Sequence, residues 1–195
     1  MKKVILAVFI ITAFMLNSCK KDSVDASQLA TVGTTWSSGT GNSSITVTES
    51  GSGGEVLVSA VYDGKAYAAA GKMTTEGISD YFYSGGDKSK EFTLVKFDAN
   101  VGDKYTFNVG NLQVVRTVIS KSTTDDEYVP ALGFYIKGIK VREDVPQGIT
   151  IDGKLTTTKT ITWSINHKFG IYYAEVVTTD GVTHSFPLNS TNAGQ

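Results

Sequence analysis

Residues 55–73, EVLVSAVYDGKAYAAAGKM, carry the clearest fold signal in the chain. Two runs of β-patterned residues, Glu55 to Tyr62 and Ala66 to Met73, flank the segment Asp63-Gly64-Lys65. An Asp-Gly pair between two such runs is a strong hairpin signal, because the tight turns that match the twist of paired strands need residues with positive φ. This stretch therefore predicts two neighbouring antiparallel strands.

The same alternation of short β-runs and turn residues continues along the rest of the chain. Val, Ile and Thr total 57 residues against 22 for Leu and Ala, and branched side chains favour strands over helices. No segment after residue 18 predicts a helix longer than a turn or two. We expect further strands, with a β-bulge where the period of two breaks at Gly138, over residues 44–49, 78–83, 90–97, 104–109, 112–120, 134–141, 160–167, 171–178 and 182–186.

These runs predict an all-β fold, a curved antiparallel sheet or open β-barrel, with a β-sandwich as the alternative. The β domain is expected over residues 31–195. Within it, Val32-Gly33-Thr34-Thr35-Trp36 resembles Val101-Gly102-Asp103-Lys104-Tyr105, sixty-nine positions later, and residues 66–73 resemble residues 134–141. A tandem duplication would explain both similarities, and would divide the domain into related halves at residues 31–98 and 99–195.

The charge balance excludes nucleic acid as a partner. Eighteen Lys and Arg oppose nineteen Asp and Glu, which gives a formal net charge of −1. The two arginines, Arg116 and Arg142, lie far apart in the sequence. Proteins that bind nucleic acids gather Lys and Arg on one face to neutralise phosphates. Since this sequence has no such cluster, we expect no nucleic-acid binding.

The amino terminus has the pattern of a secretory signal peptide over residues 1–18. Met1-Lys2-Lys3 is basic, and Val4 to Leu16 is apolar apart from Thr12. As a helix, the thirteen residues of this apolar run would span about 20 Å, which is shorter than the roughly 30 Å hydrocarbon core of a bilayer. The segment therefore predicts an export signal and not a spanning anchor.

The residues at the end of this segment, Leu16-Asn17-Ser18-Cys19, resemble the lipobox of bacterial lipoproteins. The resemblance implies cleavage before Cys19, a diacylglycerol on its sulfur and a third acyl chain on the new amino terminus. Two or more chains hold a protein firmly at a membrane. Cys19 is the single cysteine, which excludes a disulfide within the chain. Together with Cys19, the polar residues up to Ala30 are expected to form a lipidated, flexible tether, residues 19–30.

The composition directly after Cys19 resembles that of lipoproteins of the Bacteroidetes. Lys20 stands where an aspartate would signal retention in the inner membrane, so the outer membrane is expected, on its periplasmic or its surface face.

The second half contains the motifs Gly102-Asp103-Lys104-Tyr105, Ala131-Leu132-Gly133-Phe134, Lys140-Val141 and Gly170-Ile171-Tyr172-Tyr173. In these motifs it resembles a broad set of uncharacterised bacterial lipoproteins. The resemblance implies a curved antiparallel sheet or open barrel and no defined activity.

No residue pattern predicts catalysis, a cofactor or a metal site. His167 and His184 are not accompanied by a nucleophile elbow, and the spacings typical of zinc ligands and of nucleotide-binding glycines are missing. Asp125-Asp126-Glu127 could supply oxygen ligands to calcium, but it lacks the alternating spacing of an EF-hand loop and is better explained as a solvated loop.

Glu143, Asp144 and Glu175 leave a glycoside hydrolase as the least favoured alternative, since such enzymes need two carboxyl groups about 5–10 Å apart. The stronger candidates for function are aromatic side chains that can stack on sugar rings, anchor a protein partner, or pack in the core. Tyr172 and Tyr173 must point to opposite faces of a strand. The full set of candidate ligand contacts is Tyr81, Tyr83, Trp163, Tyr172 and Tyr173.

We therefore predict a lipid-anchored cell-envelope protein that is not an enzyme. Its membrane partner is reached through Cys19, and its β domain binds a protein, a glycan or a lipid. A structural component of the envelope without a ligand site is the alternative. The apolar leader, the lipobox and the missing catalytic patterns support this prediction.

Overall fold

The hairpin predicted at residues 55–73 forms as strands β3 (Glu55–Tyr62) and β4 (Lys65–Met73), paired from Glu55 opposite Lys72 to Tyr62 opposite Lys65. The predicted signal peptide, Cys19 and the Asp63-Gly64 pair lie outside the described residues. The computed structural model of the protein describes residues 28–38, 43–62, 65–84, 87–144, 148–151 and 154–193.

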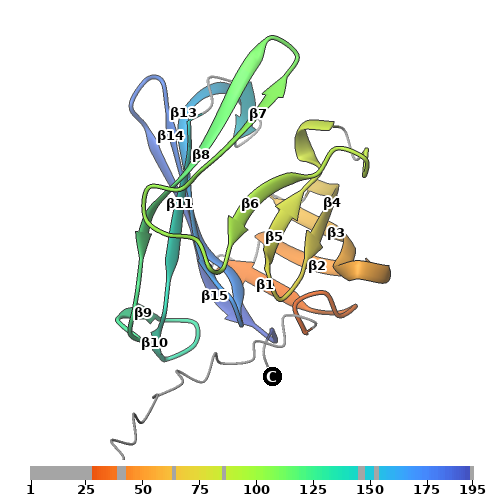
Figure 1. Ribbon diagram of the computed structural model, residues 1–195, viewed down its shortest axis with the longest axis vertical. Helices are drawn as coiled ribbons and strands as arrows, with labels where there is room; N and C mark the ends of the chain where they lie inside the picture. The colour runs from red at the N-terminus through yellow and green to blue at the C-terminus, as the bar shows by residue number, and fades with distance from the viewer. Residues whose placement is uncertain are drawn as a thin grey trace, which may run out of the picture.

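The first half of the sheet is a meander in which six strands pair in chain order (Figure 1). Every pairing within it is antiparallel, as expected for strands joined by short turns. A short 3₁₀ turn, η2 (Ser52–Gly54), precedes β3, and another, η3 (Phe82–Ser84), follows β5. The strands are β1 (Thr35–Ser38), β2 (Ser43–Ser50), β3, β4, β5 (Gly77–Asp80) and β6 (Phe92–Lys96).

The second half contributes six more strands to the same sheet, in the order β7-β8-β11-β13-β14-β15. Two excursions leave this path: β12 (Gly148–Ile151) pairs with β13, while β9 (Glu127–Val129) and β10 (Phe134–Ile136) form a separate two-stranded sheet. The six main strands are β7 (Lys104–Val109), β8 (Leu112–Lys121), β11 (Ile139–Asp144), β13 (Lys154–Asn166), β14 (Gly170–Thr178) and β15 (Thr183–Thr191).

The two meanders join into a nearly closed, barrel-like antiparallel sheet of twelve strands. β1 and β15 pair by backbone hydrogen bonds, and Figure 1 shows them meeting at the base of the molecule. At the other junction β6 and β7 are the two ends of the strand order, so no ladder joins them. The all-β prediction of a curved antiparallel sheet or open barrel is confirmed.

Inward-facing side chains of both meanders share the core. Val47, Val95, Val118, Val141 and Ile165 have no exposed surface, and each comes from a different strand. Because successive strand residues alternate in direction, every second residue of these strands contributes to the interior. The core is therefore common to both halves and does not divide between them.

The start of each meander repeats one backbone arrangement. Gly33 has a φ of 91° and donates its N–H to the carbonyl of Val47 at 2.9 Å, while Gly102 has a φ of 98° and donates to the carbonyl of Val118 at 2.8 Å. In each case the valine N–H donates back to the carbonyl of the residue after the glycine, at 2.9 Å. A positive φ of this kind favours glycine, which explains why the sequence similarity includes it. The duplication itself remains a prediction.

Two predicted strands differ in the structure. Residues 134–141 do not form one bulged strand: β10 and β11 belong to different sheets, and Gly138 lies between them. A Cβ at Gly138 would collide with the Tyr172 hydroxyl, so glycine is needed there for close approach and not for a bulge. The strand expected at 78–83 ends at Asp80, where Phe82 donates its N–H to the Asp80 carboxylate at 3.0 Å and the chain turns into η3.

Candidate functional site

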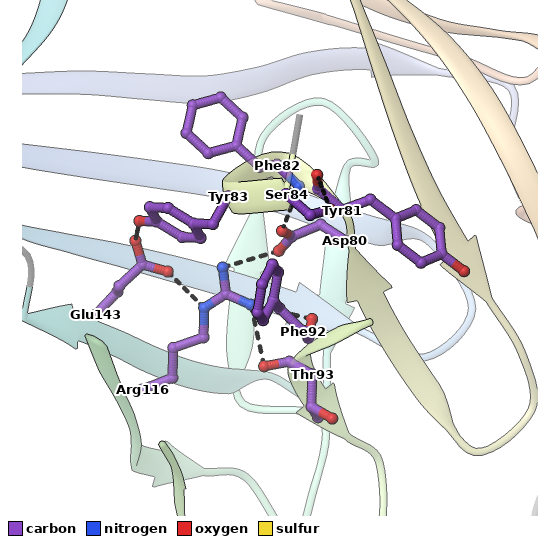
Figure 2. A network of polar contacts seen from close by, with 9 residues as sticks. All are labelled: Asp80, Tyr81, Phe82, Tyr83, Ser84, Phe92, Thr93, Arg116 and Glu143. Carbon is purple, nitrogen blue, oxygen red and sulfur yellow. Dashed lines mark hydrogen bonds and ion pairs between the residues drawn. The ribbon is translucent and has the colours of Figure 1, made fainter. Parts of the chain in front are cut away.

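A buried ion cluster lies where β5 and β6 approach β8 and β11. Arg116 on β8 is 2% exposed and Glu143 on β11 is 1% exposed. The Arg116 Nε–H donates to Glu143, and Nη2 lies 2.8 Å from Asp80 at the end of β5. Nη1 donates to the carbonyls of Phe92 and Thr93 on β6, at 3.2 Å and 3.0 Å. Figure 2 shows the guanidinium reaching into this ring of oxygen acceptors.

Aromatic rings enclose the same guanidinium. Its central carbon lies 4.9 Å from the centroid of the Phe107 ring and 5.9 Å from that of Tyr83, a range in which cations interact with aromatic faces. The Tyr83 hydroxyl donates to Glu143. Figure 2 also shows the Phe82 ring pointing away from the cluster, and its side chain is largely exposed.

The surroundings of the cluster keep Tyr83 protonated and Arg116 charged. Burial, followed by the neighbouring Glu143 carboxylate, raises the pKa of Tyr83 well above its usual range, so this phenol stays protonated as a donor. Burial alone would lower the pKa of Arg116, but Asp80 and Glu143 together raise it. The cluster fastens the seam between β6 and β7, because Arg116 on β8 bonds to two carbonyls of β6 and pairs with Asp80 on β5.

The three carboxylates considered for glycoside hydrolysis are not brought together as a facing pair. Glu143 points into the barrel, while Asp144 points to the outer face and pairs with Arg142 at 3.2 Å. Glu175 is also on the outer face, where its carboxylate accepts a hydrogen bond from the Tyr173 hydroxyl at 3.2 Å.

A second candidate site is an open groove on the outer face of the second half, which we call the hairpin groove. It has a volume of about 190 Å³ and lies between the main sheet and the β9–β10 hairpin. The sheet side is a row of directly opposed residues, since Lys140 pairs with Ser164, Ser164 with Tyr173, and Tyr173 with Pro187. The residues that line the groove are Glu127, Tyr128, Val129, Pro130, Lys140, Ser164, Tyr172, Tyr173, Pro187 and Leu188.

Glu127 organises the polar wall of this groove. Its carboxylate accepts a hydrogen bond from the Tyr172 hydroxyl and forms an ion pair with Lys140. Burial, then the bond to Glu127, raises the pKa of Tyr172 well above its usual range. Gly138 leaves room for the Tyr172 hydroxyl, as described above. The carboxylate and ammonium thus neutralise each other at the wall of the groove.

One exposed tyrosine, Tyr128, lines the groove, and a second, Tyr135, packs against it. Tyr128 on β9 and Tyr135 on β10 are directly opposed across the hairpin, with ring centroids 5.2 Å apart. They are 55% and 59% exposed. Phe134 of the same hairpin packs edge-on against Phe169, at 5.6 Å, beside a second hollow of about 280 Å³. The hairpin is therefore the most aromatic exposed part of the second half that the structure describes.

The structure separates the five aromatic candidates into two groups. Tyr81 is buried, and Tyr83 belongs to the ion cluster. Trp163 packs against core residues, and its buried indole N–H has no hydrogen-bond partner among the described residues. Tyr172 and Tyr173 both line the hairpin groove, although the Tyr172 ring is largely buried. The prediction that they point to opposite faces is wrong, because the register of β13 and β14 shifts between Ser164 and Ile165.

Tyr128, Tyr135 and Glu127 were not singled out as ligand contacts from the sequence. Glu127 had been assigned to a solvated acidic loop, and the strand that it begins was not predicted. The ion cluster was not predicted either, although the sequence contains a signal for it. Val114, Arg116 and Val118 occupy every second position of one strand, so all three face inward. A charged residue at an inward position demands a buried partner.

The fold and these two sites describe an antiparallel β protein with a nearly closed sheet, an internal ion cluster and an aromatic groove on its outer face. Comparison of the chain with protein-family models, curated proteins and solved structures finds no match. Within the described ranges, no helix has the length and apolar character needed to cross a bilayer. In the same residues, no three His, Cys, Asp or Glu side chains gather as they would around a metal ion.

The ion cluster predicts unequal costs for replacing the two arginines. Arg116→Met leaves Glu143 buried without its cation and should lower the free energy of unfolding by about 3–5 kcal/mol. Arg142→Met removes an exposed pair with Asp144 and should cost at most about 1 kcal/mol. Urea denaturation followed by tryptophan fluorescence measures both. Adding Glu143→Leu to Arg116→Met should recover part of the loss, and equal costs for the two single variants would contradict the role of the cluster.

The raised pKa values of Tyr83 and Tyr172 predict a loss of stability at high pH. Because the folded-state pKa exceeds the unfolded value of about 10, this contribution is complete below pH 10 and is lost as the pH rises further. Tyrosinate absorbance should show that these two of the nine tyrosines ionise only with unfolding. Replacing both with Phe should remove the late-titrating absorbance and leave the earlier-titrating absorbance unchanged. The opposite assignment would refute the prediction.

Proposed function

We propose that this chain is a lipid-anchored protein of the bacterial outer membrane whose β domain binds a ligand and catalyses no reaction. The anchor is supported by the basic start, the short apolar run and the lipobox-like residues that end at Cys19. Three acyl chains at that residue would give a lasting attachment, since one chain alone binds only marginally and reversibly.

The observation that carries the binding role is the hairpin groove. It combines an accessible hollow, the exposed ring of Tyr128 with Tyr135 packed against it, and several polar groups that can orient a ligand. The carboxylates of the ion cluster, in contrast, are engaged in ion pairs and hydrogen bonds inside the barrel. The accessible chemistry of the domain therefore suits recognition better than bond breaking.

The anchor predicts that Cys19→Ala releases the protein from membranes. The variant should no longer incorporate labelled palmitate and should move to the soluble fraction after a carbonate wash, because the acyl chains supply the membrane affinity. Ser23→Ala, in the polar segment that follows, is the matched control and should remain with the membranes. Cys19→Ala protein that still sediments with carbonate-washed membranes would exclude lipid anchoring.

The groove predicts a specific loss of ligand capture. The full-length lipidated protein, purified in detergent, should bind envelope material of its host, and Tyr128→Ala should weaken this binding at least about tenfold, the effect of truncating a contact worth about 1.4 kcal/mol. Tyr67→Ala, which removes a 48% exposed tyrosine from β4, should change binding less than about twofold. Equal binding by both variants and the unchanged protein would argue against the groove as the site.

A further inference from the structure

The charged side chains that line the hairpin groove neutralise each other, which disfavours a charged ligand. Glu127 and Lys140 are the charged residues that line it, and they form an ion pair with each other. An anionic or cationic ligand would have to compete with that pair. A neutral ligand with hydroxyl groups can hydrogen-bond to both partners without separating them, because an ammonium has three N–H donors and a carboxylate several acceptor positions.

The size of the groove limits how much of a ligand enters it. Its volume of about 190 Å³ is below the roughly 300–1,000 Å³ typical of pockets for drug-sized molecules. One ring-sized unit fits such a space, and a longer ligand must continue out over the rim. The exposed side chain of Tyr128 lies at that rim, and the exposed ring of Tyr135 packs against it.

The two kinds of surface in the groove match the two kinds of surface on a sugar ring. The ring C–H groups of a pyranose carry slight positive charge and pack on the negative face of an aromatic ring such as Tyr128. Its hydroxyls point outward, toward groups such as Lys140 and Glu127, which line the same groove. Covering Tyr128 and Tyr135 would also remove two largely exposed rings from water.

A protein partner fits this groove less well. The centre of a protein interface is depleted in charged residues, because a partner that excludes water leaves charges poorly solvated. Here the Glu127–Lys140 pair lies in the wall of the groove itself. Sugar hydroxyls can replace the water that such groups lose, whereas apolar protein anchors cannot.

We infer that the hairpin groove binds one neutral sugar ring of a glycan, and that Tyr128 and Tyr135 hold the ring next to it. This inference rests on the proposed binding function and names the ligand class of the same site. Tyr172, which the sequence already marked, acts as a positioning residue, because its hydroxyl holds Glu127 in the wall of the groove.

The test uses the full-length lipidated protein in a detergent without a sugar head group. Envelope material of the host is offered untreated, after periodate, which cleaves vicinal diols of sugars, or after proteinase K. The inference predicts that periodate reduces Tyr128-dependent capture at least about tenfold and that proteinase K leaves it unchanged. A neutral maltohexaose, cellohexaose or mannohexaose should compete for capture, and an acidic hexagalacturonate should not.

Three outcomes overturn the inference in distinguishable ways. Capture that depends on Tyr128, survives periodate and is lost with proteinase K would show a protein ligand, which leaves the proposed binding function standing. Competition by hexagalacturonate but by none of the neutral hexasaccharides would overturn the neutral-ligand assignment. Absence of any Tyr128-dependent capture would remove both the sugar site and the binding function, with Tyr67→Ala as the control for general damage.

Discussion

Closure of the barrel depends on the interactions that the Arg116 guanidinium makes. Ten strand pairings lie within the two meanders, and an eleventh joins β1 to β15. No backbone ladder joins β6 to β7. Arg116 spans that gap, because it bonds to Asp80 and to two carbonyls of β6 from its place on β8. Removing these charges from water costs several kcal/mol per ion, so the cluster contributes less net stability than its contacts suggest. Its main effect is on geometry, since its acceptors lie together only when the two halves meet in this register.

Neighbouring contacts support the same seam. Lys121 on β8 donates to the carbonyls of Phe97 and Ala99, at 3.1 Å and 2.7 Å, in the connection between β6 and β7. The Tyr105 hydroxyl on β7 accepts the Lys96 N–H at 3.2 Å. Side chains thus satisfy backbone groups that a strand partner would otherwise pair, which is how an open edge is protected without full closure.

The strands of the sheet could be predicted because they are governed by local patterns, and the sites could not because they depend on distant pairings. Alternation and turn residues were sufficient for β3, β4, β7, β8 and β14, which lie within about two residues of their expected limits. The break between β10 and β11 was missed, because it depends on the Tyr172 hydroxyl, which lies beside Gly138 but thirty-four positions away in sequence. The pairing of Arg116 with Glu143 likewise follows from the order β8-β11, and no local pattern specifies that order.

The β9–β10 hairpin forms its own two-stranded sheet and shares no ladder with the twelve-stranded one. Its backbone hydrogen bonds are internal, so residues at its exposed positions can change without disturbing the register of any barrel strand. Surface elements with this independence are where proteins most readily acquire new specificity on an unchanged scaffold. Homologous chains that share this barrel are therefore expected to diverge first at positions 128 and 135, while the arginine of the interior stays the same.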